Sequence, residues 1–233
     1  MLESSHSSTF LPTAAIADAP VRLGHRVRAA PLSMRRLVPA EPIVGPALPV
    51  RHFGSVDVFL EVLERAPVAG VLVIDNAGRT DEACIGDLMV AETKLAGLIG
   101  IVLWGLHRDE SALREIALPV WSLGPLSAGP TAARERVANP FSHAMVGDER
   151  VTPADIVAAD DDGVIFVTAD RWPEVSRLAA EIVGTEGSQA ADIAAGASLR
   201  QQLRFAEYLE RRAADPNYTF RPHLSERGGA IET

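Results

Sequence analysis

Continuous apolar runs alternate with stretches of helical spacing through the middle of the chain. Residues 69–75, 99–104 and 119–123 are apolar runs of strand length, which are typical of strands covered on both faces. Between these runs, residues 86–95 and 111–116 repeat their apolar positions at helical intervals, as amphipathic helices do. The order strand–helix–strand–helix–strand therefore predicts an α/β fold whose parallel strands are joined by right-handed crossovers.

The segment before this unit predicts two helices and one further strand. A short helix is expected over residues 14–24, where Gly24 would end it. Residues 26–49 are rich in proline and irregular, and a strand is expected at 45–50. Residues 56–65 (VDVFLEVLER) again show helical spacing. The parallel unit thus gains a strand and a covering helix on its N-terminal side.

The segment after the unit has a different pattern. Residues 124–142 have the composition of a loop, and residues 144–151 indicate a hairpin around Gly147-Asp148. Residues 155–167 place two apolar runs on either side of Asp160-Asp161-Asp162-Gly163. Three aspartates would suit a metal site, but acidic residues that end in Asp-Gly between two strands are more often a tight turn. We therefore expect a turn at this position.

Helical periodicity dominates the C-terminal end of the chain. Residues 173–183 and 188–213 both show it, and Ser188 is a suitable N-cap for the second helix. No internal repeat and no linker composition divides the chain. The expected organisation is a flexible N-terminal tail (1–13), one α/β domain (14–183) and a helical C-terminal arm that makes an oligomer contact (184–233).

Composition narrows the class of protein and its location. Hydrophobic residues make up 47% of the 233 residues and charged residues 23%, as in ordinary globular proteins. The apolar run at 95–106 is interrupted by glycines and is too short to span a membrane. The net charge of −9 argues against a nucleic-acid partner. The single cysteine, Cys84, excludes an internal disulfide, which fits the reducing cytoplasm. We expect a cytoplasmic protein without a membrane partner.

The basic residues restrict the possible chemistry. Of the 22 lysines and arginines, Lys94 is the one lysine, so it is the one candidate for a Schiff base. Lys94 follows Asp87 by seven residues on the same predicted helix, which places it about 10 Å along the helix axis. We therefore expect Lys94 to be a solvated charge remote from any site at the start of that helix.

Polar residues gather at two neighbouring strand-to-helix junctions, residues 84–89 and 105–109. In parallel α/β sheets, ligands lie outside the carboxyl ends of the strands, and the amides of a helix start bind carboxylates. Arg108 could pair with a carboxylate in bidentate fashion, and Asp109 is a hard oxygen ligand suited to Mg²⁺ or Mn²⁺. These residues could bind an organic acid and a metal, although an Arg-Asp pair after a strand is more often a helix cap or a surface ion pair.

The stretch from Gly86 to Asp109 reads G-D-L-M-x-A-x(8)-G-I-V-x-x-G-x-x-R-D. It resembles the signature of the family that contains the regulator of ribonuclease E activity A (RraA) and the class II 4-hydroxy-4-methyl-2-oxoglutarate aldolases. Three further stretches agree with the resemblance, which covers roughly residues 14–170 in consistent order: Ile16-Ala17-Asp18-Ala19, Val44-Gly45-Pro46-Ala47 and Val157-Ala158-Ala159-Asp160-Asp161-Asp162-Gly163-Val164.

The resemblance implies a swivelling β/β/α-type domain with a parallel strand core. It also implies a homo-oligomer, a trimer or alternatively a hexamer, with active sites between subunits. The activity that it implies is aldol cleavage of a 2-oxo acid or decarboxylation of oxaloacetate, both through a pyruvate enolate that a divalent metal (Mg²⁺ or Mn²⁺) stabilises. A second function within the same family is open: a non-catalytic regulator that binds a ribonuclease complex.

Roles for individual residues also follow from the resemblance. The backbone at Gly86, Asp87, Leu88 and Met89 would hold the pyruvyl carboxylate. Arg108 would contact the oxygens of the substrate. Asp109 would ligate the metal, largely through water, and Asp87 would orient a water molecule as the base. The aldolases also take a glutamate from the C-terminal region of a neighbouring chain, and four glutamates are available here: Glu207, Glu210, Glu226 and Glu232.

The chain departs from the family pattern at several positions. Trp104 stands where many members have an aspartate, and His107 where a small apolar residue is usual. Residues 124–130 replace a common Pro-Arg-Gly segment. His107 is an alternative metal ligand beside Asp109, although imidazole suits other metals better. For Cys84 we expect a packed thiol rather than a nucleophile. These departures leave the expected metal site intact and the substrate open.

Overall fold

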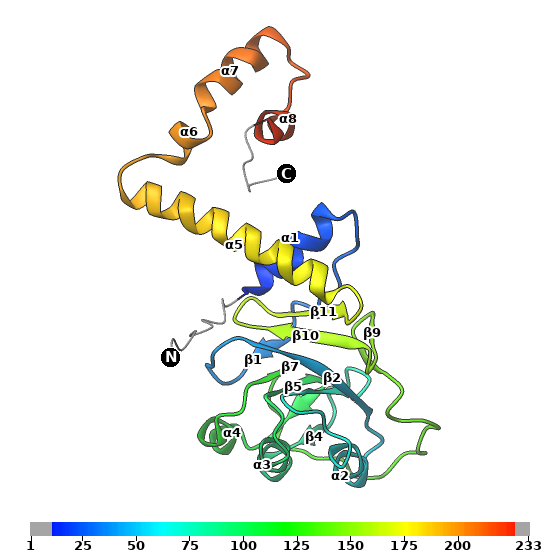
Figure 1. The fold of residues 1–233 in the computed structure, drawn as a ribbon. Helices are drawn as coiled ribbons and strands as arrows, with labels where there is room; N and C mark the ends of the chain where they lie inside the picture. The colour runs from blue at the N-terminus through cyan, green and yellow to red at the C-terminus, as the bar shows by residue number, and fades with distance from the viewer. Residues whose placement is uncertain (1–10, 227–233) are drawn as a thin grey trace, which may run out of the picture.

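The computed structural model describes residues 11–226. A seven-stranded sheet forms its centre, and Figure 1 shows this sheet between helices on both sides. Its strands in chain order are β1 (Arg35–Arg36), β2 (Ile43–Arg51), β3 (Val71–Asp75), β5 (Gly100–Trp104), β7 (Val120–Ser122), β10 (Asp155–Ala159) and β11 (Val164–Thr168). In space the strand order is β1-β7-β5-β3-β2-β10-β11.

The four central strands run parallel, and the sequence predicts this for three of them, β3, β5 and β7. β2 pairs with β3, β3 with β5 and β5 with β7, all in parallel register, with Asp75 opposite Trp104 at the carboxyl ends. β10 and β11 join on the β2 side as antiparallel strands. Every residue of β3 is buried, which agrees with its unbroken apolar sequence.

Helices cover the sheet in two separate groups (Figure 1). The helices α2 (Asp57–Leu63), α3 (Asp87–Leu95) and α4 (Glu110–Ile116) lie along one side of the parallel strands. A cluster of buried side chains that includes Phe59, Val90 and Leu113 fills the space beneath them. On the other side, α1 (Thr13–Arg22) and α5 (Trp172–Ala194) pack on β10 and β11. This architecture confirms the α/β class that the sequence predicts.

Two small two-stranded sheets complete the domain. β4 (Ala83–Ile85) pairs in parallel with β6 (Leu106–His107), and no element was expected at either position because both are very short. β8 (Ala144–Val146) and β9 (Glu149–Val151) form the predicted hairpin, with Gly147 at a positive φ of 60°.

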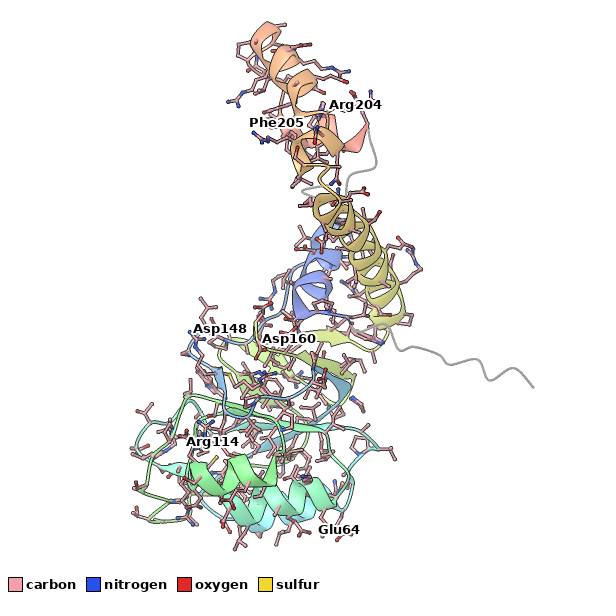
Figure 2. The ribbon with its side chains drawn as sticks, turned by 90° about the vertical axis from the view of Figure 1, so that its left-hand side faces the viewer. Glu64, Arg114, Asp148, Asp160, Arg204 and Phe205 are labelled. Atoms are coloured by element: carbon pink, nitrogen blue, oxygen red, sulfur yellow. The ribbon has the colours of Figure 1, made fainter. Side chains whose placement is uncertain are left out.

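The acidic sequence between β10 and β11 forms the predicted tight turn. The Asp160 amide donates to the Gly163 carbonyl, and the φ of Gly163 is 141°. The Asp160 carboxylate accepts hydrogen bonds from the amide and the hydroxyl of Thr13, at 2.8 and 2.6 Å. It also accepts one from the Asp162 amide. This carboxylate therefore ties α1 to the sheet, and Figure 2 labels Asp160 between the sheet and α1.

The predicted division of the C-terminal helices is wrong. α5 runs unbroken through residues 184–187, where a boundary was expected, and Val175, Ala179 and Ile182 anchor its first half to α1. The chain then breaks at Gly196, whose φ is 98°. In place of the expected helix over 188–213, α5 continues to Ala194 and two short helices follow, α6 (Leu199–Gln202) and α7 (Phe205–Ala214). A further helix, α8 (Phe220–Ser225), lies beyond that range.

The C-terminal arm has a small core of its own. Rings of Phe205, Tyr208, Phe220 and His223 contact one another, with centroids 4.9 to 5.8 Å apart. Figures 1 and 2 show α6 to α8 beyond the far end of α5, remote from the sheet. Among residues 11–226, none of the helices combines the length and the apolar character needed to cross a membrane. The expected flexible tail lies outside the described residues up to residue 10.

Candidate active site

A glycine at the start of α3 allows the two predicted junctions to meet. Gly86 is the N-cap of α3 with extended backbone. A Cβ on Gly86 would lie well under 3.0 Å from Asp109 Oδ2, and 3.2 Å from the Cγ and Nε atoms of Arg108. The absence of a side chain at Gly86 is therefore what permits the close approach of both functional residues.

Strand pairing positions the second junction beside the first. β6 lies parallel to β4, and the Arg108 amide donates to the Ile85 carbonyl at 3.0 Å. Asp109 follows as the N-cap of α4 in a left-handed conformation, with φ 61° and ψ 37°. Such a conformation is uncommon for a residue other than glycine and is concentrated at functional sites. The backbone of Asp109 changes direction at the pocket, and α4 begins at the next residue.

The charged groups of the two junctions are in mutual contact. Asp109 Oδ2 lies 3.4 Å from Arg108 Nε and 3.4 Å from the Asp87 amide nitrogen. The Leu88 amide donates to Asp87 Oδ1 at 2.8 Å. Two carboxylates thus lie at the amides of the first turn of α3, where the helix dipole favours negative charge. The carboxylate of a ligand could take the same position.

A cavity of about 230 Å³ opens beside these groups. It is lined by His52, Val56, Ala83, Cys84, Ile85, Gly86, Asp87, Leu88, Met89, Arg108 and Pro130. A second and more open hollow lies on the other side of Arg108, and Asp109, Glu110 and Ser127 contribute to its lining. Arg108 therefore separates an apolar cavity from a carboxylate-rich hollow.

Residues 124–130 form a wall of the site although their sequence departs from the family pattern. The Leu126 amide donates to the His107 carbonyl, and the Ala83 amide donates to the Ala128 carbonyl. A Cβ on Gly129 would lie 2.9 Å from Arg108 Nη1. This segment therefore packs directly against the guanidinium.

A buried polar network adjoins the cavity at His52, and no sequence motif pointed to it. His52 Nδ1 lies 2.9 Å from Asn76 Oδ1, which also accepts a hydrogen bond from Arg134. Arg134 holds Glu82 in bidentate fashion, with both distances 2.8 Å. Burial lowers the pKa of His52, and the hydrogen bond from Arg134 lowers the pKa of Glu82. His52 is thus kept neutral, whereas Glu82 is kept charged.

The other sequence candidates lie apart from this constellation or have little reactivity. His107 is buried with its Nδ1 2.8 Å from Ser122 Oγ, and it lines neither hollow. Burial lowers the pKa of His107. Trp104 packs over Gly78. Cys84 lines the cavity, and burial raises the pKa of its thiol. Lys94 donates to the Ile116 carbonyl at the opposite end of α3.

The side chains of the site could hold a divalent metal through one carboxylate, that of Asp109. Among residues 11–226 no group of three or more His, Cys, Asp or Glu side chains comes together. A Mg²⁺ ion keeps several waters and is commonly held by one or two carboxylates together with substrate oxygens. Asp109 meets this requirement because its contacts with the described residues use Oδ2, which leaves Oδ1 for a ligand. Of the candidate neighbouring glutamates, Glu232 lies outside the described residues.

The fold and the pocket together define a class: an α/β domain with a curled sheet and a carboxylate–arginine pocket at the carboxyl ends of its parallel strands. Residues 13–166 match the family model RraA-like, described as Aldolase/RraA, and the chain belongs to this family.

Solved structures share the fold. An uncharacterized protein from Pseudomonas syringae pv. tomato str. DC3000 has a TM-score of 0.71 at 24% identity, and the match covers 82% of this chain and 92% of that one. RraAS2 of Streptomyces coelicolor, described as an unusual member of the RNase ES inhibitor RraA protein family, has a TM-score of 0.67 at 27% identity, over 76% and 90% of the two chains. The RNA-processing inhibitor RraA of Thermus has a TM-score of 0.56 at 23% identity, over 64% and 90%.

Proposed function

We propose that the chain is a divalent-metal-dependent lyase that cleaves or decarboxylates a 2-oxo acid. The observation that carries the proposal is the meeting of Gly86, Arg108 and the start of α3 around one cavity, with Asp109 in contact with Arg108 and lining the adjoining hollow. A docking module has no need of an arginine and a carboxylate held at a helix N-terminus beside a cavity. The arrangement fits recognition of a carboxylate and stabilisation of developing negative charge.

Each residue of the site has its own proposed role in the reaction. The amides of Asp87, Leu88 and Met89 bind the carboxylate of the 2-oxo acid, displacing the side chains that now accept from them. Arg108 pairs with the substrate's oxygens and fixes its orientation. Asp109 would hold Mg²⁺ or Mn²⁺, which supplies Lewis-acid stabilisation of the enolate. Asp87 takes or returns the proton through a water molecule.

We also propose an oligomeric state and a cellular compartment for the protein. We propose a homo-oligomer, a trimer or alternatively a hexamer, in which the helical arm of residues 184–233 contacts a neighbouring copy. The α/β domain of residues 14–183 would then carry the catalytic groups, and residues 1–13 would form a tail. The single cysteine fits the cytoplasm as the compartment.

Oxaloacetate is the substrate of choice for a test because its decarboxylation needs no matching tail. We expect turnover with Mn²⁺ or Mg²⁺ above an enzyme-free metal blank, loss of turnover with a chelator, and recovery when metal is added back. Asp109→Asn keeps the size of the side chain but removes its charge, so turnover should fall by at least about 100-fold with the fold intact.

Asp148→Asn is the matched control, because Asp148 is exposed in the turn between β8 and β9 and lines neither hollow. It should leave the rate unchanged. Turnover that survives chelation, or a fully active Asp109→Asn variant, would contradict the metal assignment.

The alternative function is a non-catalytic regulator that binds a ribonuclease. Two structural relatives favour it: one is an RNA-processing inhibitor, and the other is an unusual member of the RNase ES inhibitor RraA protein family. The Asp109→Asn variant separates the two functions. Ribonuclease inhibition that survives this substitution, with no turnover of any 2-oxo acid by the unaltered chain, would support the regulator.

A further inference from the structure

We propose that Arg134 is a positioning residue of the site: it fixes the loop of residues 128–134 and thereby holds Arg108 in the orientation that the substrate requires. The inference rests on the proposed function, in which Arg108 pairs with the oxygens of the 2-oxo acid. It goes further because it gives a role to a buried ion pair that the proposed reaction does not use.

The segment between β7 and β8 is long and irregular. Residues 123–143 contain neither a helix nor a named strand. Connections of this length are uncommon in compact domains, and many of them are functional. The beginning of the segment is fixed beside β6, because the Leu126 amide donates to the His107 carbonyl at 2.8 Å. The 128–134 loop follows, and Pro130 within it lines the cavity.

Two contacts with adjacent residues close the 128–134 loop. At its beginning, the Ala128 carbonyl accepts from the Ala83 amide at 2.7 Å. At its end, Arg134 holds the Glu82 carboxylate through both terminal nitrogens, each at 2.8 Å. Because Glu82 and Ala83 are neighbours in the chain, the two ends of the loop are held close together. Loss of the Arg134 contact would release one of these ends.

The closed loop contacts the guanidinium of Arg108. A Cβ on Gly129 would lie 2.9 Å from Arg108 Nη1, so the backbone of the loop passes directly against this nitrogen. The Nε atom of the same guanidinium lies 3.4 Å from Asp109 Oδ2. The Arg108 side chain is half-exposed, and a long side chain of this kind has several rotamers available. The loop excludes the rotamers that would place the guanidinium where Gly129 lies.

Arg134 also connects this loop to the opposite part of the cavity lining. Its Nη2 donates to Asn76 Oδ1 at 3.2 Å, and His52 Nδ1 lies 2.9 Å from the same oxygen. His52 is itself part of the lining. The backbone amide of Arg134 donates to the Phe53 carbonyl at 2.6 Å. One side chain therefore holds Pro130 and His52 in register around the cavity.

The burial of Glu82 decides which variant tests the role of Arg134. Glu82 is 5% exposed, and a bidentate pair fixes the direction of a guanidinium as well as its distance. Arg134→Gln alone would leave a buried carboxylate without this partner, which endangers the fold. The double variant Glu82→Gln, Arg134→Gln removes that charge and still lacks the bidentate contact. It is the variant of choice.

A second ion pair of the same geometry provides the matched control. Arg26 holds Glu149 in bidentate fashion at 2.8 and 2.7 Å, and Glu149 is 6% exposed. Neither residue lines the cavity. The control is therefore the double variant Arg26→Gln, Glu149→Gln, which removes a comparable pair without affecting the loop.

Hydrogen exchange followed by mass spectrometry tests the loop without any substrate. In the full chain carrying Glu82→Gln and Arg134→Gln, the amides of Ala83 and of residue 134 should exchange at least about tenfold faster, because local opening of the loop exposes both. The control should exchange at these amides like the unaltered chain. Unchanged exchange in the variant would overturn the inference.

Steady-state kinetics with oxaloacetate and Mn²⁺ tests the effect on Arg108. Arg108 contacts the substrate in the ground state and the transition state alike, so its misplacement should raise KM by about fivefold or more and leave kcat within about twofold. A merely structural role of the pair would reduce the amount of folded enzyme, which lowers the apparent kcat and leaves KM unchanged. The control should keep both constants.

The single variants identify the contact through which Arg134 acts. If it acts through Glu82, the KM of the double variant should not exceed that of the more impaired single variant. A KM that rises by the product of the two single effects, or faster exchange with an unchanged KM, would overturn the inference and leave the proposed function standing. Absence of turnover by the unaltered chain would overturn the proposed function and the inference with it.

Discussion

At the scale of single residues, Gly86 determines whether the site can form. Its φ of −139° is open to any residue, so the backbone makes no demand for glycine. Glycine is needed here because Asp109 and Arg108 occupy the space that a Cβ would need. The glycine is therefore required for the site rather than for the fold.

Gly86→Ala should consequently damage activity far more than stability. We expect kcat/KM for oxaloacetate to fall by about tenfold or more because Asp109 must move, while the free energy of unfolding changes by about 1 kcal/mol or less. Steady-state kinetics and urea denaturation measure the two effects. Gly184→Ala is the control, since nothing lies within 4 Å of its added Cβ. An active Gly86→Ala variant would place the chemistry elsewhere.

Sequence reasoning found the residues of the site that lie close together along the chain. Arg108 and Asp109 are adjacent, and the start of α3 carries a recognisable motif. His52, Glu82 and Arg134 form an equally definite network, but they come from distant segments. No spacing rule links them, because their contact depends on how the loops after β2, β3 and β7 fold over the sheet.

At the scale of elements, the parallel unit was predictable and the shortest strands were not. β3 and β5 can be predicted because each is an unbroken apolar sequence. β4 and β6 are two to three residues long, and they exist because each pairs with the other across the pocket. The end of α5 was misjudged because Gly184 and Gly187 resemble a boundary, whereas the helix continues through both to Ala194.

The position of Lys94 in α3 predicts that it takes no part in catalysis. Its ammonium group donates to the Ile116 carbonyl at the end of α4, at the opposite end of α3 from the cavity. Lys94→Arg keeps the charge and a donor, so activity should stay within about twofold of the unaltered chain. Borohydride added with substrate should trap no adduct by mass spectrometry. An adduct on Lys94 would establish Schiff-base chemistry in place of the proposed metal mechanism.

At the scale of the whole molecule, the α/β domain (residues 14–183, the body) makes little contact with the described part of the C-terminal arm (residues 184–233). Figure 2 places Arg204 and Phe205 at one end of the molecule and Arg114 at the other. Beyond Val183, most residues of α5 are exposed, and this half of the helix contains two glycines, Gly184 and Gly187. A helix of this kind gains little stability from its own sequence, which supports the proposal that a second copy covers it.

Loss of apolar side chains on the arm should therefore dissociate the oligomer. Ile193 in α5 and Leu209 in α7 are 48% and 49% exposed. The double variant Ile193→Asp, Leu209→Asp removes apolar contacts and places charges in the proposed interface, so light scattering should show a fall from trimer or hexamer toward monomer. Leu95→Asp is the control, because Leu95 is an 81% exposed leucine on α3 in the body. The control should keep the assembly of the unaltered chain. If the double variant keeps it too, or if the unaltered chain is already monomeric, the arm has another role.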